Sequence, residues 1–342
     1  MITIRDVARE AGVSIATVSR VFNNAEAVAT DTRREVRAVA TRLGYSPHGA
    51  ARSLITRRTA TIGLILPDLY GEFFSELIRG VDHAVRAKGY HLLVSSSHAD
   101  RAEVDSAMAL MRGRVDGLVV MLPERQQEQT PLISGRLPLV RLGGAPHNGD
   151  ADAIVVANRE GARAMVRHLV SLGHKHIGVI SGAAGNSDAE ERMSGVRDGL
   201  SDAGLGEDAL LRAAGDFSEA SGFRAAREML RANPRPTAIF ALNDAMAIGA
   251  LSALRAEGVR VPSDIAVAGF DDIPMAQFLD PPLTTVRVDI SAMGARAATR
   301  VLSHLGNGPS GSGVEIVPTT LMVRRSCGNP GAWSPTIPES LS

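Results

Sequence analysis

Apolar residues recur at helical spacing through residues 3–23, in two short segments separated by a glycine. The apolar faces consist of Val7, Ala8 and Ala11 in the first segment and of Val18, Val21 and Phe22 in the second. Thr3 with Asp6 has the spacing of a capping box, and Ser14 is a suitable N-cap for the second segment. Gly12 permits the positive φ of a tight turn. The pattern predicts a helix-turn-helix unit, with an ordinary helical hairpin as the alternative.

The next segment predicts a third helix. Residues 31–43 place apolar side chains on one side and arginines on the other, and Gly44 stands where a helix ends. Ala29 offers no side-chain oxygen as a cap, so we expect Thr30 or Asp31 to cap this helix.

A short, weak helix is expected at about residues 47–55, after the potential cap Ser46. One or two turns that contain Gly49 are not stable alone, so this helix must fold against something else. Leu54 ends it as an apolar side chain among arginines, which suits a wedge entering the minor groove of DNA. A simple linker is the alternative.

Residues 3–58 resemble the DNA-binding headpiece of the lactose-repressor (LacI/GalR) family of bacterial transcription regulators. The motifs that carry the resemblance are DVAREAGVS, TVSRVFN, TRREV, LGYSP and AARSL. The predicted DNA-binding residues are Ser14, Ile15, Ala16, Thr17, Ser19, Arg20, Asn23, Arg52 and Leu54. The resemblance implies that Ile15, Ala16 and Arg20 read the major groove and that the hydroxyl side chains contact phosphates. It also implies that Leu54 intercalates at the centre of the operator.

The distribution of charge agrees with a DNA-binding headpiece. The 342-residue chain carries 37 basic and 37 acidic residues, but residues 1–60 hold ten arginines against five acids. A basic module on a mildly acidic body favours contacts with phosphates without spreading non-specific attraction over the whole surface.

Beyond residue 60, short apolar runs alternate with amphipathic segments. The expected strands are residues 61–67, 90–97, 117–123, 137–143, 176–182, 237–243 and 265–272, and helices are expected near 73–88 and 102–113. Runs that are apolar on both faces and separated by helices favour parallel sheets covered on both sides. Two such series predict two α/β lobes. The resemblance extends through this region and implies a periplasmic-binding-protein-like core with a cleft between the lobes.

The predicted organisation has three parts. An all-α helix-turn-helix headpiece spans residues 1–58, a two-lobed effector-binding and dimerisation core spans 59–327, and a disordered tail spans 328–342. Within the core we expect residues 287–313 to cross back to the first lobe and residues 314–325 to return to the second. Dimers are expected because one recognition helix covers only half a site.

Candidate effector-binding residues follow the predicted strands, since ligands of open α/β sheets gather at the carboxyl ends of strands. They are Asp68, Phe73, Phe74, Arg192, Phe217, Asn243 and Asp271. Polar groups beside aromatic faces suit a polyhydroxylated ring, and the resemblance places the last four at effector-contacting positions of sugar-responsive members. Alternatively, Asn243 or Asp244 only caps the following helix, and Arg192 with Asp271 forms an interlobe salt bridge.

Three positions depart from the family pattern and bear on the effector. Gly143 stands where several members have aspartate, and Val288 stands where sugar- and purine-binding members often have glutamine. Asn186 occupies a position that is arginine in the purine-responsive branch. These departures favour a sugar or sugar derivative, with a purine or another metabolite as the alternative.

The sequence predicts no catalytic residue, no cofactor and no metal site. Cys327 is the only cysteine, His174 and His176 have no carboxylate or cysteine at ligand spacing, and no dinucleotide loop, P-loop or nucleophile elbow occurs. The core alone would permit a solute-binding protein, but the headpiece and the lack of a signal peptide oppose it. We therefore expect a cytoplasmic, homodimeric repressor without membrane segments that binds a palindromic double-stranded operator under the control of a small molecule.

Overall fold

The computed structural model describes residues 2–23, 28–45, 58–98, 100–121, 137–144, 152–306 and 313–328. The chain forms two compact units, Met1–Thr61 with Gly113–Asp116 and Ile62–Arg112 with Gly117–Ser342.

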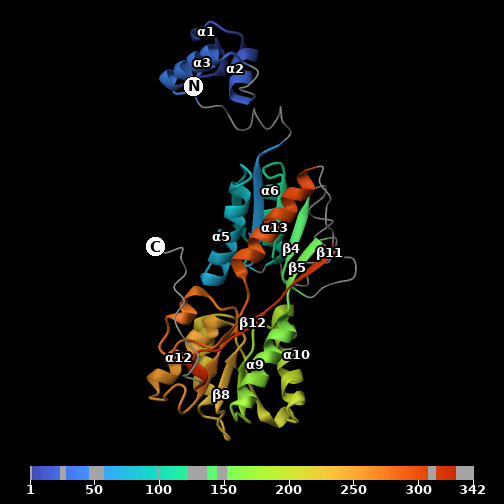
Figure 1. Cartoon of the computed structure of the whole chain (residues 1–342), viewed down its shortest axis with the longest axis vertical. Coiled ribbons are helices and arrows are strands. Elements are labelled where there is room, and N and C mark those ends of the chain that lie inside the picture. Colours follow the sequence, from blue (N-terminus) through green and yellow to red (C-terminus); the bar gives the residue numbers. More distant parts are fainter. Residues whose placement is uncertain are drawn as a thin grey trace. The chain divides into compact units, whose positions relative to one another are not determined.

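The described part of the first unit contains three helices, drawn in blue in Figure 1: α1 (Ile4–Glu10), α2 (Ile15–Asn23) and α3 (Thr30–Leu43). Fully buried valines from all three helices form its core: Val7, Val18, Val21, Val36 and Val39. The ring of Phe22 meets Tyr45 edge-on, with 5.9 Å between the ring centroids. The helix-turn-helix pattern and the third helix predicted from the sequence are confirmed.

Local hydrogen bonds define how the first two helices begin. The Asp6 carboxylate accepts the backbone N–H of Thr3 at 2.9 Å, and the Ser14 hydroxyl accepts the backbone N–H of Thr17 at 3.0 Å. Gly12, between the helices, has a φ of +63°, as the tight turn requires.

The expected cap of the third helix is wrong. The N-cap is Ala29, which makes no side-chain cap bond, because α3 begins at Thr30 and includes both Thr30 and Asp31 in its first turn. The helix ends at Gly44 in the left-handed region, as predicted.

The first lobe of the second unit contains a six-stranded sheet in the order β11-β5-β4-β3-β1-β2. The strands are β1 (Thr61–Leu66), β2 (His91–Ser96), β3 (Gly117–Val120), β4 (Leu139–Leu142), β5 (Asp152–Val156) and β11 (Gly313–Val317). The pairings from β11 to β1 are parallel. The helices that the structure describes in this lobe are α5 (Glu72–Arg86), α6 (Arg101–Met111) and α13 (Ile290–Leu305). α5 and α13 lie side by side (Figure 1); Gly80 permits this contact, since a Cβ there would lie 1.9 Å from the carbonyl oxygen of Ser291.

The second lobe contains a four-stranded parallel sheet in the order β7-β6-β8-β9. Its strands are β6 (Ile177–Ile180), β7 (Leu210–Ala213), β8 (Ala238–Ala241) and β9 (Ala266–Ala268). Its helices are α9 (Asn158–Ser171), α10 (Ser187–Asp202), α11 (Glu219–Met229) and α12 (Asp244–Ala256). α9 packs on α10 and α11 packs on α12. The predicted two-lobed α/β core with parallel sheets is confirmed.

The chain passes between the lobes from β5 to α9, from β10 (Thr285–Arg287) to α13, and from β11 to β12 (Thr320–Met322), as Figure 1 shows. The expected crossing of residues 287–313 to the first lobe is confirmed for Ile290–Leu305, which form α13 and pack on α5. The expectation that residues 314–325 all belong to the second lobe is wrong for Val314–Val317, because these residues form β11 and pair in parallel with β5. The return begins only after Val317, and β12 then pairs antiparallel with β10.

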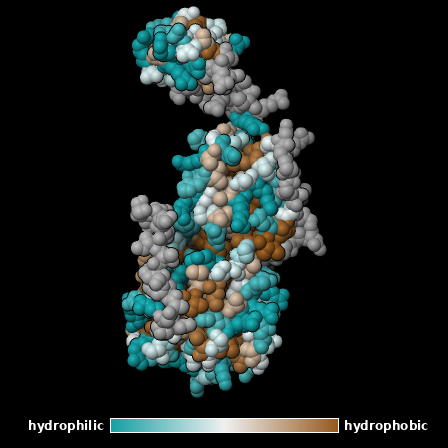
Figure 2. Space-filling view, in the orientation of Figure 1, coloured by the Kyte–Doolittle hydropathy of each residue, from teal (hydrophilic) through white to brown (hydrophobic). Residues whose placement is uncertain are grey.

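The surface of the core carries both hydrophobic and hydrophilic residues. No described helix is long and apolar enough to span a bilayer. Several large apolar side chains are nevertheless exposed, including Leu93, Leu110 and Phe278. Figure 2 shows patches of hydrophobic residues (brown) among hydrophilic ones on the drawn face of the core.

Candidate functional site

Helix α2 exposes the side chains that were predicted to meet DNA. Ile15, Ala16 and Arg20 are exposed, while Val18 and Val21 on the opposite side are fully buried. Small and hydroxyl side chains allow this face to approach base edges closely, and the Arg20 guanidinium supplies donors that a guanine can accept.

The hydroxyl side chains that were predicted to contact phosphates lie just before α2 and within it. Ser14 Oγ lies 2.9 Å from Thr17 Oγ1 as well as capping the helix, and Thr17 and Ser19 are half-buried. The side chain of Asn23, and the residues Arg52 and Leu54 of the expected hinge helix, lie outside the described residues, as does the predicted tail beyond Gly328.

The core contains a cavity of about 1210 Å³ lined by residues of both lobes. All seven predicted effector residues line it: Asp68, Phe73, Phe74, Arg192, Phe217, Asn243 and Asp271. They come from segments that follow the carboxyl ends of strands, where an open α/β sheet collects its ligand. The structure therefore brings the whole predicted set together.

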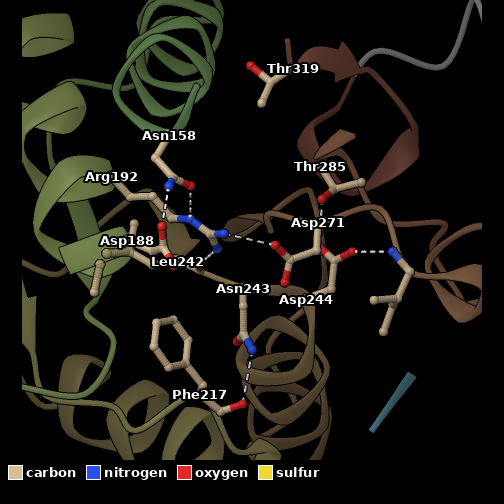
Figure 3. A network of polar contacts seen from close by, with 12 residues as sticks. Asn158, Asp188, Arg192, Phe217, Leu242, Asn243, Asp244, Asp271, Thr285 and Thr319 are labelled. Carbon is tan, nitrogen blue, oxygen red and sulfur yellow. Dashed lines mark hydrogen bonds and ion pairs between the residues drawn. The ribbon is translucent and has the colours of Figure 1, made fainter. Parts of the chain in front are cut away.

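Arg192, on α10, is the centre of a polar network (Figure 3). Its Nε donates to Oδ1 of Asn158 at 2.8 Å, and Nη1 donates to the carbonyl oxygen of Leu242 at 2.5 Å. The guanidinium also lies 3.8 Å from the centroid of the Phe270 ring. These contacts fix the guanidinium in a buried position, since the side chain is only 7% exposed.

Asp271 forms an ion pair with Arg192, with 3.1 Å between Oδ1 and Nη2. Both residues belong to the second lobe, so the alternative of an interlobe salt bridge is wrong; the pair is formed within one lobe. Burial raises the pKa of Asp271 to about 6, an effect that the nearby Arg192 partly offsets. Oδ1 lacks a well-aligned hydrogen-bond donor among the described residues. The backbone is also strained there, with a φ of +112°.

Asn243 holds Phe217 against the cavity. Its Oδ1 accepts the backbone N–H of Met246 at 2.9 Å, which confirms that Asn243 caps α12. Its Nδ2 also donates to the carbonyl oxygen of Phe217 at 3.0 Å. Phe217 has a φ of +71°, and a Cβ at Gly182 would lie 2.2 Å from its ring. The side chain of Asn243 therefore both caps α12 and positions the ring of Phe217.

Asp244 does not cap the helix, so that alternative is wrong. Its carboxylate is fully buried and accepts the hydroxyl of Thr285 at 2.6 Å and the backbone N–H of Ile273 at 2.9 Å. Burial, together with Asp271, raises the pKa of Asp244 well above its ordinary value. Asp244, which follows β8, therefore links the end of this strand to the segments that contain Ile273 and Thr285.

The first lobe contributes an aromatic wall and two carboxylates. Phe73 and Phe74 meet edge-on, with 5.4 Å between their centroids. Asp68 accepts the backbone N–H of Leu69 at 2.6 Å, so one of its carboxylate oxygens is used to order its own turn. Glu72 accepts the backbone N–H of Met275 in the second lobe at 2.8 Å.

Sequence reasoning missed two residues of this network, Asp188 and Asn158. Oδ1 of Asp188 accepts Nδ2 of Asn158 at 2.8 Å and the backbone N–H of Gly144 at 3.1 Å. Asp188 stands one helical turn before Arg192, which was a usable signal. Asn158 follows a strand that the sequence pattern did not reveal.

The structure shows the surroundings of the three residues that depart from the family pattern. A Cβ at Gly143 would lie 3.0 Å from Oδ2 of Asp188, so the carboxylate of Asp188 occupies the space beside this glycine. Asn186 caps α10 by accepting the backbone N–H of Ala189 at 2.9 Å. Val288 is buried.

No group of three or more His, Cys, Asp or Glu side chains within the described ranges is placed to hold a metal ion. The ring of His174 lies 3.1 Å from the hydroxyl of Thr237 instead, and burial lowers its pKa.

Comparison with protein families gives two matches. Residues 3–48 match the model described as bacterial regulatory proteins, lacI family. Residues 166–327 match the model of a periplasmic binding protein-like domain.

Relatives and solved structures cover nearly the whole chain. The HTH-type transcriptional repressor PurR of Pasteurella multocida (strain Pm70) is 34% identical over 329 residues, which are 95% of this chain and 98% of the relative. The ribose operon repressor of Escherichia coli (strain K12) is 37% identical over 307 residues, or 89% of this chain and 93% of the relative. The crystal structure of the lac repressor dimer bound to operator and the anti-inducer ONPF has a TM-score of 0.86 at 30% identity and covers 95% of this chain and 99% of its own.

Proposed function

Since this chain belongs to the lacI family of bacterial regulatory proteins, we propose that a sugar or sugar derivative, bound in the cavity between its core lobes, controls its affinity for operator DNA. As a member of this family the chain is a DNA-binding transcription regulator that responds to a small molecule and is not an enzyme. The proposal concerns the kind of effector, its site and the residues that read DNA.

The observation that carries the effector proposal is the meeting of Arg192, Asp271 and Asn243 with the ring of Phe217 in one cavity. A sugar presents hydroxyl groups that donate and accept hydrogen bonds, and its C–H faces stack on aromatic rings. Asp271 offers a buried carboxylate oxygen that forms an ion pair with Arg192 but has no well-aligned donor among the described residues, and a ring hydroxyl can donate to it. Phe73 and Phe74 offer apolar contact from the opposite lobe.

A purine is the second candidate effector. Asn186 disfavours it, because it stands where the purine-responsive branch has arginine and its side chain caps α10 instead. The ribose operon repressor, at 37% identity, is a relative whose name joins the family to a sugar.

Control of DNA binding follows from the two-lobed site. An effector shifts operator affinity only if it binds unequally to two arrangements of the lobes. Because the cavity is lined from both lobes, a bound sugar favours the arrangement that closes around it. Either release from the operator or tighter binding is compatible with this scheme.

The DNA-binding half of the proposal assigns base reading to Ile15, Ala16 and Arg20, and phosphate contacts to the hydroxyls of Ser14, Thr17 and Ser19. The remaining proposed contacts come from Asn23, Arg52 and Leu54. One copy of α2 covers half a site, so we propose a homodimer on a palindromic operator. Exposed apolar side chains of the core, such as Leu93 and Leu110, are available for a partner subunit to cover.

A gel-shift experiment tests the function. The full chain should retard the DNA upstream of its own gene or of neighbouring genes, and one member of a sugar panel should change the apparent Kd. Arg192→Ala should bind the same DNA but lose the response to that sugar. A sugar response retained in Arg192→Ala would show that Arg192 is only structural. A response to purine bases alone would replace the sugar by the second candidate.

The wedge is tested separately with Leu54→Ala. Loss of an intercalating side chain should weaken operator binding strongly while the effector still binds to the core. Unchanged operator affinity would refute the assignment of Leu54.

A further inference from the structure

The described lining of the effector cavity is rich in carboxylates and poor in basic side chains. The acidic residues among the lining are Asp68, Glu72, Asp188, Asp216, Glu219 and Asp271. Arg192 is the only lysine or arginine of the described residues that line the cavity. Acidic residues alone do not make a binding site, so the position of each charge decides what the cavity accepts.

The positive charge of Arg192 is already used. Its guanidinium forms the ion pair with Asp271 and donates to Asn158 and to the carbonyl oxygen of Leu242. A phosphate or carboxylate on the ligand would have to compete with Asp271 for this cation. Proteins that bind such anions instead supply arginine or lysine side chains or free backbone N–H groups.

Asp188 adds a further negative charge to the lining of the cavity. Both hydrogen bonds that it accepts come from uncharged donors, the side chain of Asn158 and the backbone of Gly144. Its charge is felt inside the site, because Asp188 is among the groups that raise the pKa of Asp271. An anionic ligand would meet the same repulsion.

Asp271 also indicates what the ligand carries. Its side chain is only 6% exposed and lines the cavity, and its Oδ1 forms the ion pair with Arg192 but has no well-aligned hydrogen-bond donor among the described residues, so it can accept a further bond. A hydroxyl or N–H of a ligand satisfies this oxygen, whereas the oxygens of a carboxylate or phosphate dianion only accept hydrogen bonds.

We propose that the effector carries no negative charge, and that Asp188 is the side chain that selects against phosphate and carboxylate groups. The inference rests on the proposed function, since it takes this cavity as the effector site. It narrows the effector to an unphosphorylated, non-acidic molecule rich in hydroxyl or N–H donors.

The matched variant for the test is Asp188→Asn. Both accepted hydrogen bonds reach Oδ1 of Asp188, so an asparagine whose amide oxygen takes that place keeps both bonds and loses only the charge. The control is Glu190→Gln, which removes one negative charge from the exposed side of the same helix.

Titration calorimetry of the full chain would use pairs of similar size: glucose with glucuronate, galactose with galacturonate, and ribose with ribose 5-phosphate. Adenine and hypoxanthine would serve as uncharged purines. In the wild type we expect the uncharged member of a binding pair to bind at least about tenfold more tightly than its anion. Asp188→Asn should reduce that ratio about tenfold or more, while Glu190→Gln should leave it unchanged.

The outcomes separate this inference from the proposed function. An anion that binds the wild type as tightly as its uncharged partner would overturn the inference and leave the sugar proposal intact. A ratio that is the same in Asp188→Asn and in the wild type would overturn the role of Asp188. Binding of a purine base without any sugar would support the charge selection and contradict the sugar. No binding by any uncharged compound would contradict both.

Discussion

The carboxylate of Asp188, in the second lobe, accepts the backbone N–H of Gly144, in the first lobe, at 3.1 Å. A second carboxylate links the lobes in the opposite sense, because Glu72 of the first lobe accepts the backbone N–H of Met275 in the second at 2.8 Å. Each bond joins a side chain of one lobe to the backbone of the other. The lobes are therefore held together by bonds that have to break if the cleft opens.

The first prediction follows from this pairing. Asp188→Ala should destabilise the core by about 1–3 kcal/mol, because it leaves the donors of Asn158 and Gly144 without their partner. Asp188→Asn should stay near the wild type, since its amide oxygen accepts both bonds. Urea denaturation followed by circular dichroism measures the difference. Equal losses in the two variants would mean that the charge, and not the hydrogen bonds, stabilises this arrangement.

The second prediction concerns pH. Burial raises the pKa of Asp271 to about 6, and ligand hydroxyls that donate to the carboxylate favour its ionised form. The ligand therefore binds less tightly where Asp271 is protonated. Affinity for the effector should rise between pH 5 and pH 7, by about tenfold if only the ionised form binds, and level off above pH 7.

Calorimetry at pH 5, 6, 7 and 8 measures this dependence. His98 is the only histidine among the described residues that line the cavity, so His98→Gln is the control and should keep the rise. A rise that disappears in His98→Gln would assign the pH dependence to the histidine instead of Asp271.

Much of the fold could be predicted from the sequence, because most strands of the two parallel sheets are apolar on both faces and stand out from amphipathic helices. The pattern did not predict β5, because this strand is five residues long and begins with Asp152, whose carboxylate is paired with Arg300 at 2.6 Å. The strand β11 was placed in the wrong lobe for a related reason. Its alternating exposure suits an edge strand, and nothing in its sequence names the sheet that it joins.

The candidate effector residues could be predicted because strand ends and family motifs mark them. Asn158 could not, and Asp188 only from its place one helical turn before Arg192, since their importance comes from a contact between segments distant in the chain. Pairing of Asp188 with Gly144 depends on how the two lobes face each other, which no local pattern encodes. The same holds for Asp244, whose position suggested a helix cap but whose partners, Thr285 and Ile273, lie far along the chain.

The third prediction tests the buried position of Asp244. A Cβ at Gly269 would lie 2.1 Å from Oδ1 of Asp244, and this oxygen is held by the hydroxyl of Thr285. Gly269→Ala should therefore lower the free energy of unfolding by about 1–3 kcal/mol, the range found when a packed core is overfilled. Urea denaturation gives the value.

The background variant Asp244→Ala shows whether the clash is the cause. Removal of the carboxylate opens the space, so adding Gly269→Ala there should cost clearly less than in the wild type. An equal cost in both backgrounds would place the conflict elsewhere, for example against Leu283, whose side chain lies 3.0 Å from the same added atom.

The fourth prediction concerns sequence reading by α2. Arg20 is exposed on the face opposite the buried Val18 and Val21, so Arg20→Ala should leave the fold of the headpiece intact. If Arg20 contacts guanine in the major groove, the variant should lose about 1–3 kcal/mol of operator binding and discriminate less at one base position in each half-site. Gel shifts with operators that carry single substitutions measure both effects.

Ser14→Ala is the comparison, because a phosphate contact carries no base preference and its loss should weaken all operators alike. A uniform loss for Arg20→Ala as well would make Arg20 a phosphate contact, and base reading would then have to come from Ile15 and Ala16 through shape and thymine methyl groups.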